Sequence, residues 1–362
     1  MPTYPSLRIR GLKARAVNVP MRRPHPTSSG TIATYPIALL DLTTEEGITG
    51  HSYVFSYTPI ALVPLTQLIN NLESLIKGDA VVPADLDQKL QQKFRLLGPQ
   101  GLTGMAMAGI DMAAWDAVAK AAGLPLVTLL GGKPGALPAY SSEGLNQPDA
   151  TAREAEQLCA MGFKALKFKI GHPTVETDIA VIQAARRAVG DHIGIIVDYN
   201  QSLSVPEALR RCARLDDLGL TWIEEPTLAH DFAGHAKIAA AIRTPIQIGE
   251  NWWGPADMLK SIAAGASDLA MPDVMKIGGV TGWLEAAALA EKHQLPVSSH
   301  IFCEFSAHLL GVTPTRQFLE YNDWADPIVR EPIQIQDGQA LIPDRPGAGL
   351  EWNEDAVKKY QV

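Results

Sequence analysis

The chain has 362 residues, 46% of them hydrophobic and 19% charged, which is typical of a globular protein with two domains or one large barrel with additions. Its formal net charge of −8, with no run of more than two Lys or Arg residues, argues against a nucleic-acid-binding surface or a basic tail. Three cysteines, Cys159, Cys212 and Cys303, form no CxxC motif, and their odd number favours a reducing, cytoplasmic location. We find no apolar stretch suited to a secretory signal or to spanning a bilayer.

The first segment, residues 1–130, is predicted to be an α+β capping domain. Strand patterns cover Leu7–Val19, Ile37–Leu42 and Ile48–Val54, which is typical of a β-meander. The stretch 21–30, MRRPHPTSSG, is rich in Pro, Ser and Gly, and we predict a long loop of the kind that often forms a lid.

Three helical stretches follow, at Pro59–Lys77, Pro83–Phe94 and Thr103–Ala122. The last is rich in small residues and stops at Gly123, a residue that often ends helices. We therefore expect it to be a buried core helix.

The second segment, residues 131–325, alternates short apolar runs with helix-length stretches. Eight runs have strand character: 138–144, 163–171, 193–200, 220–226, 246–251, 269–279, 295–300 and 317–322. Eight βα repeats predict a (β/α)8 barrel, since a doubly wound sheet would need fewer repeats and would usually carry a glycine-rich nucleotide fingerprint. The remaining segment, residues 326–362, contains the hairpin signal Asp337-Gly338 and is expected to return to the capping domain.

Polar residues end the predicted barrel strands, where barrel enzymes place their active sites. One polar strand end is common and uninformative, because charged residues often lie where a strand meets a loop. Seven consecutive strands with such an end argue against surface charges alone: Lys167 and Lys169, Asp198 and Asn200, Glu224, Glu250, Asp273, His300 and Glu320.

Asp198, Glu224 and Glu250 end three adjacent predicted strands. Three carboxylates would repel one another strongly at low dielectric unless a cation balanced them. An all-oxygen ligand set favours Mg²⁺, whereas zinc would prefer Cys or His ligands. For Glu224 alone, the alternative is a salt bridge to a flanking helix, a role that we assign to its neighbour Glu225.

Two further pairs are candidate bases. Lys167 and Lys169 lie two apart on one strand and therefore share a face, where a second ammonium and partial desolvation lower the pKa of a lysine. We assign Lys169 as a base and Lys167 as its partner, which also neutralises a substrate carboxylate. Asp273 ends the strand before that of His300, so it can orient the imidazole and raise its basicity.

These residues suggest removal of a proton next to a carboxylate, because Lys169 and His300 would flank a ligand from opposite sides of the barrel mouth. The dianionic enolate that forms would be stabilised by Mg²⁺, by Lys167 and by a hydrogen bond from Glu320 if that residue is protonated.

The sequence resembles the enolase superfamily, and within it the mandelate racemase subgroup, over nearly its whole length. The matching motifs are RAVNVP, HSYVFSYTP, AGIDMAAWDA, KFKIG, VDYNQS, TWIEEPT, GENW, MPDVMKIGGVTGW and SSH. The resemblance implies a capping domain over a (β/α)8 barrel, Mg²⁺ at Asp198, Glu224 and Glu250, and bases Lys169 and His300 with Asp273. It also implies an electrophilic Glu320, Asn200 near the substrate hydroxyl, Ser142 near the carboxylate or metal, a matching Tyr57, and often an octamer.

The segment Met21–Pro26 departs from that subgroup, whose corresponding flap is apolar. His25 is a candidate substrate contact, and with Arg22 and Arg23 it would suit a polar or doubly anionic substrate unless both arginines face solvent. Glu143, after Ser142, stands where the relative carries a histidine.

The first functional hypothesis is racemisation of a 2-hydroxy acid by a homo-oligomeric enzyme that binds a small carboxylate substrate. The alternative is dehydration of an acid sugar, which begins with the same proton removal; the opposed bases favour racemisation and the polar flap favours dehydration. A non-catalytic metal-binding barrel would not need both bases, and a metal hydrolase would need a water-activating base instead of two opposed proton acceptors.

Overall fold

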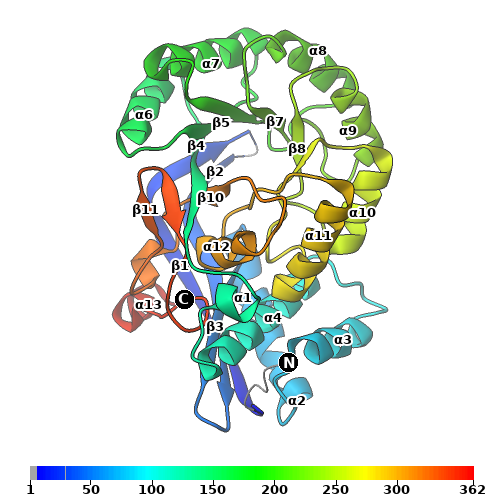
Figure 1. Cartoon of the computed structure of the whole chain (residues 1–362), viewed down its shortest axis with the longest axis vertical. Helices are drawn as coiled ribbons and strands as arrows, with labels where there is room; N and C mark the ends of the chain where they lie inside the picture. Colours follow the sequence, from blue (N-terminus) through cyan, green and yellow to red (C-terminus); the bar gives the residue numbers. More distant parts are fainter. Residues whose placement is uncertain (1–5, 29) are drawn as a thin grey trace.

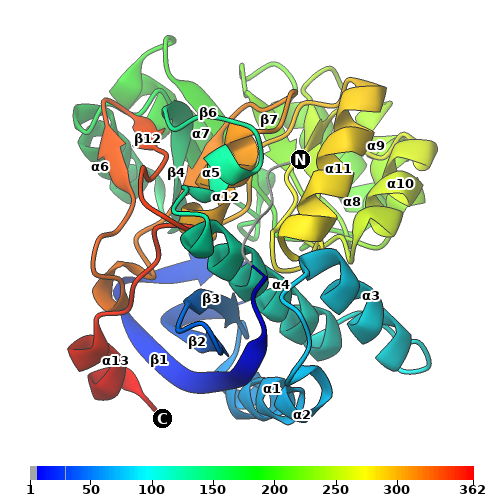
Figure 2. The same cartoon turned by 60° about the horizontal axis from the view of Figure 1, so that its bottom comes forward.

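The computed structural model describes residues 6–28 and 30–362, which form an antiparallel sheet with helices packed beside a parallel barrel (Figures 1 and 2). Residues 1–5, the start of the predicted first domain, and Ser29, within the predicted loop, lie outside the described residues. The predicted fold class, a (β/α)8 barrel with an N-terminal α+β capping domain, is confirmed.

The capping sheet has three antiparallel strands in the order β1-β2-β3: β1 (Ile9–Thr27), β2 (Gly30–Thr44) and β3 (Thr49–Phe55). Four helices follow, α1 (Pro59–Asn71), α2 (Glu73–Ile76), α3 (Pro83–Lys93) and α4 (Leu102–Ala121), close to the predicted ranges. Helix α4 is buried over most of its surface, because its many Ala and Gly residues allow the sheet to pack closely on it, as expected of a core helix.

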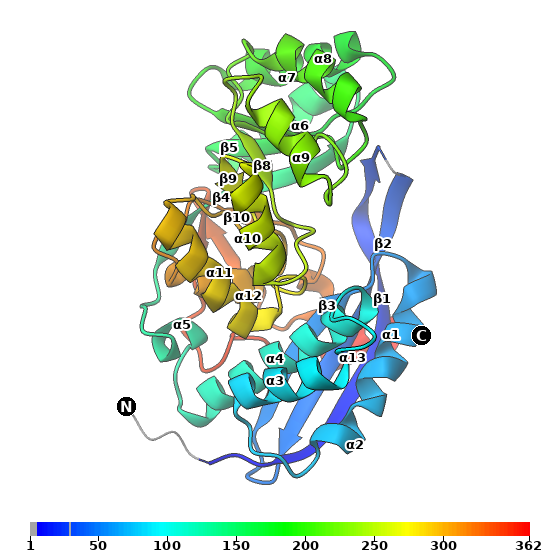
Figure 3. The same ribbon diagram turned by 90° about the vertical axis from the view of Figure 1, so that its right-hand side faces the viewer.

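The predicted loop at 21–30 is wrong: β1 and β2 continue through it as a long hairpin arm. After a register shift between Pro20 and His25, pairing resumes with His25 opposite Ile32 and Thr27 opposite Gly30. The prolines that suggested a loop are tolerated because β1 is an edge strand, whose outward N–H groups need no partner. Figure 3 shows the arm reaching from the cap to the barrel, where Ser28 Oγ donates a hydrogen bond of 3.0 Å to the carbonyl of Tyr199.

Six strands of the barrel pair in parallel in chain order: β4 (Ala136–Leu145), β5 (Ala165–Lys169), β6 (Gly194–Asp198), β7 (Trp222–Glu224), β8 (Ile246–Ile248) and β9 (Leu269–Ala270). The predicted strand at 295–300 is present only as single bridges, from Val297 to Ala270 and Arg316 and from His300 to Asp273. The eighth strand, β10 (Leu319–Tyr321), pairs with β4 and closes the ring.

Helices surround the barrel strands (Figure 1): α6 (Pro148–Ala160), α7 (Val175–Val189), α8 (Val205–Leu215), α9 (Phe232–Ala239), α10 (Pro255–Ala264), α11 (Gly279–His293) and α12 (Cys303–Gly311). Helix α8 illustrates why they form, since its buried residues Ala208, Cys212 and Leu215 recur at helical spacing. The short helix α5 (Leu126–Leu129) links the cap to the barrel.

The C-terminal segment contacts both parts of the molecule. It contains η1 (Asp326–Ile328), β11 (Gln334–Gln336), β12 (Gln339–Leu341) and α13 (Glu354–Tyr360). Strand β12 pairs antiparallel with the beginning of β4, and the Val362 amide donates to the Ala16 carbonyl on β1. None of the helices in the described residues has the length and apolar character needed to cross a membrane.

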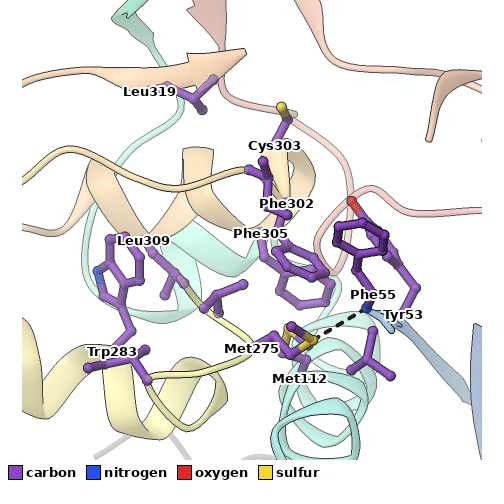
Figure 4. Close-up of a cluster of buried hydrophobic side chains, with 14 of the residues drawn as sticks. Tyr53, Phe55, Met112, Met275, Trp283, Phe302, Cys303, Phe305, Leu309 and Leu319 are labelled. Carbon is purple, nitrogen blue, oxygen red and sulfur yellow. Dashed lines mark hydrogen bonds between the residues drawn. The ribbon is translucent and has the colours of Figure 1, made fainter. Parts of the chain in front are cut away.

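The cap and the barrel share one hydrophobic interface, shown in Figure 4. Tyr53 of β3 stacks on Phe302 with ring centroids 5.0 Å apart, and the Phe55 amide donates to the Met275 sulfur over 3.3 Å. Met275 lies in the turn after Asp273, so the cap packs directly against a loop at the barrel mouth.

Substituting Gly50 should test how closely the cap sheet packs on α4. A Cβ at Gly50 would overlap the Ala113 carbonyl and approach Ala117, so Gly50→Ala must push β3 away from the helix. We expect a loss of about 3 kcal/mol in unfolding free energy, seen as a lower thermal midpoint. The matched control is Gly135→Ala, whose Cβ would meet open space; equal midpoints for the two variants would contradict the close packing.

Candidate metal centre and active site

A cavity of about 560 Å³ lies at the carboxyl ends of the barrel strands, beneath the hairpin arm and the loop after β3. Eight predicted site residues line it: His25, Tyr57, Ser142, Lys169, Asn200, Glu250, His300 and Glu320. The other four, Lys167, Asp198, Glu224 and Asp273, are fully buried and contact members of this set through their side chains. The structure therefore brings these twelve residues together at one end of the barrel.

Strand register explains why three distant carboxylates meet. Lys169 of β5 pairs with Asp198 of β6, and Asp198 pairs with Glu224 of β7, so these side chains end their strands at the same level. Glu250 follows β8 after a turn at Gly249. All three carboxylates are buried, and one oxygen from each lies within 4.8 Å of the others.

This cluster has the chemistry and the dimensions of a magnesium site. Oxygens on opposite sides of Mg²⁺ are separated by about 4.2 Å, and the ion prefers carboxylate ligands with some retained waters. The immediate surroundings also contain more acidic groups than basic ones. Six carboxyl groups face three lysines: Asp198, Glu224, Glu225, Glu250, Asp273 and Glu320 against Lys167, Lys169 and Lys276. A divalent cation corrects most of this imbalance.

The pKa of Glu224 reflects the closeness of these carboxyl groups. Burial raises its pKa to about 8, and the nearby carboxylates of Asp198, Glu320 and Glu250 act in the same direction against the opposing charge of Lys167. A bound cation reverses this effect, because it favours the ionised carboxylate.

Lys167 and Lys169 occupy different positions relative to the cavity. Lys167 Nζ lies 2.6 Å from Glu224 Oε1 and 2.7 Å from Glu320 Oε1, entirely out of contact with solvent. Burial lowers its pKa, but Glu224 and Glu320 outweigh that effect and hold the pKa well above its usual range, so it remains a cation. Lys169 Nζ lies 2.7 Å from Asp198 Oδ2 and lines the cavity, whereas Lys164 is exposed.

Asp273 and His300 form a hydrogen-bonded pair. His300 Nδ1 lies 2.6 Å from Asp273 Oδ2, and Nε2 is 3.3 Å from Glu250 Oε2. Burial lowers the pKa of His300, but Glu250 and Asp273 outweigh it and raise the pKa above its ordinary value. Asp273 is fixed in turn by the backbone N–H groups of Met275 and Lys276, which both donate to its Oδ1.

The predicted role of Glu320 as a hydrogen-bond donor requires a protonated carboxyl group. Burial raises its pKa, but the charges of Lys167, His300 and Lys169 overcome that effect and lower the pKa to about 2. Its carboxylate also accepts a hydrogen bond from the backbone N–H of Ile301. In this arrangement Glu320 is ionised, so it acts as an acceptor.

Among the described residues that line the cavity, Asn322 Nδ2 and two further buried side-chain atoms have no hydrogen-bond partner. One is Asn200 Oδ1; the other end of this side chain donates to Asp198 Oδ2 over 3.0 Å. The second is the hydroxyl oxygen of Tyr57. Both residues have left-handed backbone conformations, with φ of 44° and 59°, a strain that is frequent at functional sites. These atoms are available to a ligand hydroxyl or carboxylate.

The hairpin arm carries three basic residues, Arg22, Arg23 and His25, of which only His25 lines the cavity. Its ring packs edge-on against Trp324 at 5.2 Å, and burial, together with the charges of Lys169 and Lys167, lowers its pKa to about 3, so it is neutral. Arg22 and Arg23 are exposed and line an adjoining outer pocket of about 330 Å³, where Arg22 lies 3.4 Å from Asp323. This pocket shares His25, Ser142 and Trp324 with the main cavity, but neither arginine lines the cavity itself.

Sequence reasoning missed Asn251 and Lys276 and misassigned Glu225. Glu225 forms no salt bridge to a flanking helix within the described residues; it is buried and accepts a hydrogen bond of 2.8 Å from Asn251 Nδ2. Lys276 Nζ lies 2.5 Å from Asn251 Oδ1. The signals were present, since Glu225 and Asn251 directly follow proposed metal ligands and Lys276 is a charge in the otherwise apolar run after Asp273.

Comparisons with known proteins agree with this geometry. Residues 9–131 match the family model of the mandelate racemase / muconate lactonizing enzyme N-terminal domain, and residues 150–356 match the enolase C-terminal domain-like family. The L-talarate/galactarate dehydratase of Salmonella typhimurium is 35% identical over 77% of this chain and 72% of its own length.

Two solved structures are also similar. An enolase from Bradyrhizobium, in complex with magnesium and mandelic acid, is 48% identical, with a TM-score of 0.96 and full coverage of both chains. An L-talarate dehydratase from Polaromonas sp. JS666, in complex with Mg and L-glucarate, is 30% identical, with a TM-score of 0.91 and 98% coverage of both chains. The chain belongs to the enolase superfamily of magnesium-dependent enzymes, in the mandelate racemase subgroup.

Proposed function

We propose that the protein is a Mg²⁺-dependent acid-sugar dehydratase that removes the proton next to a substrate carboxylate. The observation that carries the proposal is the position of Lys169 and His300, which line one buried cavity beside a cluster of three carboxylates. The names of several relatives support dehydration over the racemisation that we considered first. These include L-talarate/galactarate dehydratase and arabinonate dehydratase, while other relatives are named as cycloisomerases and epimerases.

The chemistry has two steps. Removal of the α-proton leaves an electron pair beside the carboxylate, and Mg²⁺ at Asp198, Glu224 and Glu250 would stabilise the charge that develops on the carboxylate oxygens. The electron pair then forms a C=C bond while the bond to the β-hydroxyl breaks, and a proton delivered to the departing oxygen produces water. The resulting enol tautomerises to a 2-keto-3-deoxy acid.

Each site residue has a role in this proposal. Lys169 removes the α-proton, and His300, oriented by Asp273, delivers the proton to the departing hydroxyl. Lys167, held as a cation, neutralises the substrate carboxylate. Asn200 accepts a hydrogen bond from a substrate hydroxyl through its unpaired oxygen. The remaining cavity contacts with the substrate come from Glu320, Ser142, Tyr57 and His25.

Racemisation of a 2-hydroxy acid is the second candidate, favoured by the cavity wall. Ile32, Phe55, Met105, Trp253 and Trp324 form an apolar lining opposite the charged groups, which suits an aromatic substituent. The similar Bradyrhizobium structure contains mandelic acid. In this reaction the same two bases would remove the proton from one face and return one to the other.

Removing one proposed metal ligand tests the magnesium site. Glu250→Gln should raise the dissociation constant for Mg²⁺ by more than about 100-fold, because loss of a partner outside the ligand shell already costs roughly 10–100-fold. Isothermal titration of Mg²⁺ into the metal-free protein measures this change. The matched control, Glu285→Gln on the exposed face of α11, should bind Mg²⁺ like the unaltered protein. Equal affinities for both variants would reject the assignment.

A deuterium-exchange assay distinguishes the two reactions. The enzyme is incubated in D₂O with Mg²⁺ and single-enantiomer acids, namely galactarate, L-talarate, gluconate and mandelate, and the α-proton is followed by NMR. Dehydration predicts a new keto acid, whereas racemisation predicts exchange with the hydroxyl retained. A keto product from none of the acid sugars, with racemised mandelate, would replace the first proposal by the second.

The bases are tested with two pairs of variants. Lys169→Ala and His300→Asn should each lower kcat at least about 1,000-fold, since each removes a proton-transfer group. Either variant can retain exchange of the α-proton from one stereoisomer, because the other base remains. Lys164→Ala and His192→Asn change exposed residues of the same types and should keep full activity. Normal turnover by Lys169→Ala and His300→Asn would show that the bases lie elsewhere.

A further inference from the structure

Three side chains behind the proposed metal ligands form a continuous chain across successive strand ends. Glu225 follows β7, Asn251 follows β8, and Lys276 lies in the turn after β9. All three side chains are buried or partly buried, and none of the three is a proposed metal ligand or base. Asn251 and Lys276 also line the main cavity.

The amide of Asn251 has its orientation fixed by its neighbours. Its Nδ2 lies 2.8 Å from Glu225 Oε1 and 3.1 Å from Glu250 Oε1, and its Oδ1 lies 2.5 Å from Lys276 Nζ. An ammonium only donates hydrogen bonds, so Lys276 requires Oδ1 to face it, and this leaves Nδ2 facing the two carboxyl groups. One side chain therefore joins a proposed ligand, a second carboxylate and a cation.

Lys276 supplies the positive charge of this unit. Its Nζ lies 4.3 Å from the centre of the Tyr57 ring, a cation–π contact with the cap. Within the described residues no carboxylate lies within 4.0 Å of it, so its ammonium is not neutralised by a direct ion pair. Its backbone is also anchored, because the Lys276 amide donates to Asp273 Oδ1.

We infer that Asn251 and Lys276 are positioning residues that hold the Glu250 carboxylate in place for a divalent cation. The amide donates to Oε1 of Glu250, and Oε2 lies 3.3 Å from His300 Nε2, so the carboxylate is oriented from two sides. In this orientation one of its oxygens lies within 4.8 Å of oxygens of Asp198 and Glu224. Lys276 polarises that amide and offsets any negative charge on Glu225, which is buried beside Glu250. This inference rests on the metal site of the proposed function, and it adds a layer of residues that determines the affinity of that site.

Two variants break the unit at different points. Asn251→Leu removes both ends of the amide at nearly constant volume, and Lys276→Met removes only the charge. Each should raise the dissociation constant for Mg²⁺ by roughly 10–100-fold, the effect usual for partners of metal ligands. Isothermal titration into metal-free protein measures the affinity, and thermal unfolding in EDTA confirms that each variant is folded. Lys276→Gln replaces Lys276→Met if the latter does not fold.

The controls separate positioning from a general loss of structure. Lys260→Met changes an exposed lysine on α10, whose partner is Asp257 at 2.9 Å, and should leave Mg²⁺ binding unchanged. Lys276→Arg keeps the charge and should recover most of the affinity lost in Lys276→Met. In steady-state assays the apparent KM for Mg²⁺ should rise in both variants.

Two results would overturn the inference. Unchanged Mg²⁺ affinity in both folded variants would show that the unit does not act on Glu250. A raised KM for the acid substrate with unchanged Mg²⁺ affinity would assign Lys276 to substrate binding instead. Because the titration needs no substrate, failure of every acid to react would reject the proposed reaction and leave the positioning result intact.

Discussion

The mutual repulsion of buried carboxylates is the constraint on which this active site depends. Asp198, Glu224 and Glu250 lie together at the end of the barrel, where little water can screen them, and the neighbouring lysines compensate only part of their charge. A divalent cation among these side chains would relieve the repulsion and keep all three carboxylates ionised. In the proposed reaction the same cation would stabilise the charge that develops when a carboxylate-bearing substrate loses a carbon-bound proton.

Strand register in the barrel brings these distant carboxylates to one place. Each βα unit returns the chain to the same level of the ring, so residues that end β5, β6 and β7 become lateral neighbours although they are about 27 residues apart. Strands β5, β6 and β7 carry Lys167, Lys169, Asp198 and Glu224, whereas the cap contributes residues such as Tyr57 from loops. The proposed metal ligands and bases therefore all belong to the barrel.

Much of this arrangement could be predicted from the sequence, because a polar residue after each buried apolar run is a repeated and directional signal. Glu225 was misassigned because strand alternation places it opposite Glu224, whereas its left-handed backbone, with φ of 39°, turns it inward. The arm at 21–30 was taken for a loop because its prolines mask pairing that an edge strand permits. Lys276 was overlooked because its partner, Asn251, lies one βα unit away, and single-sequence patterns do not reveal such pairs.

The hairpin arm contributes to the cavity wall but carries none of the groups proposed for the chemistry. It begins and ends in the cap sheet, reaches the barrel through the Ser28–Tyr199 hydrogen bond, and carries His25 and Ile32 to the cavity wall. None of the proposed metal ligands or proton-transfer groups lies on it. Substitutions along this one hairpin would therefore reshape the cavity wall while the metal ligands and bases proposed for the barrel stay the same.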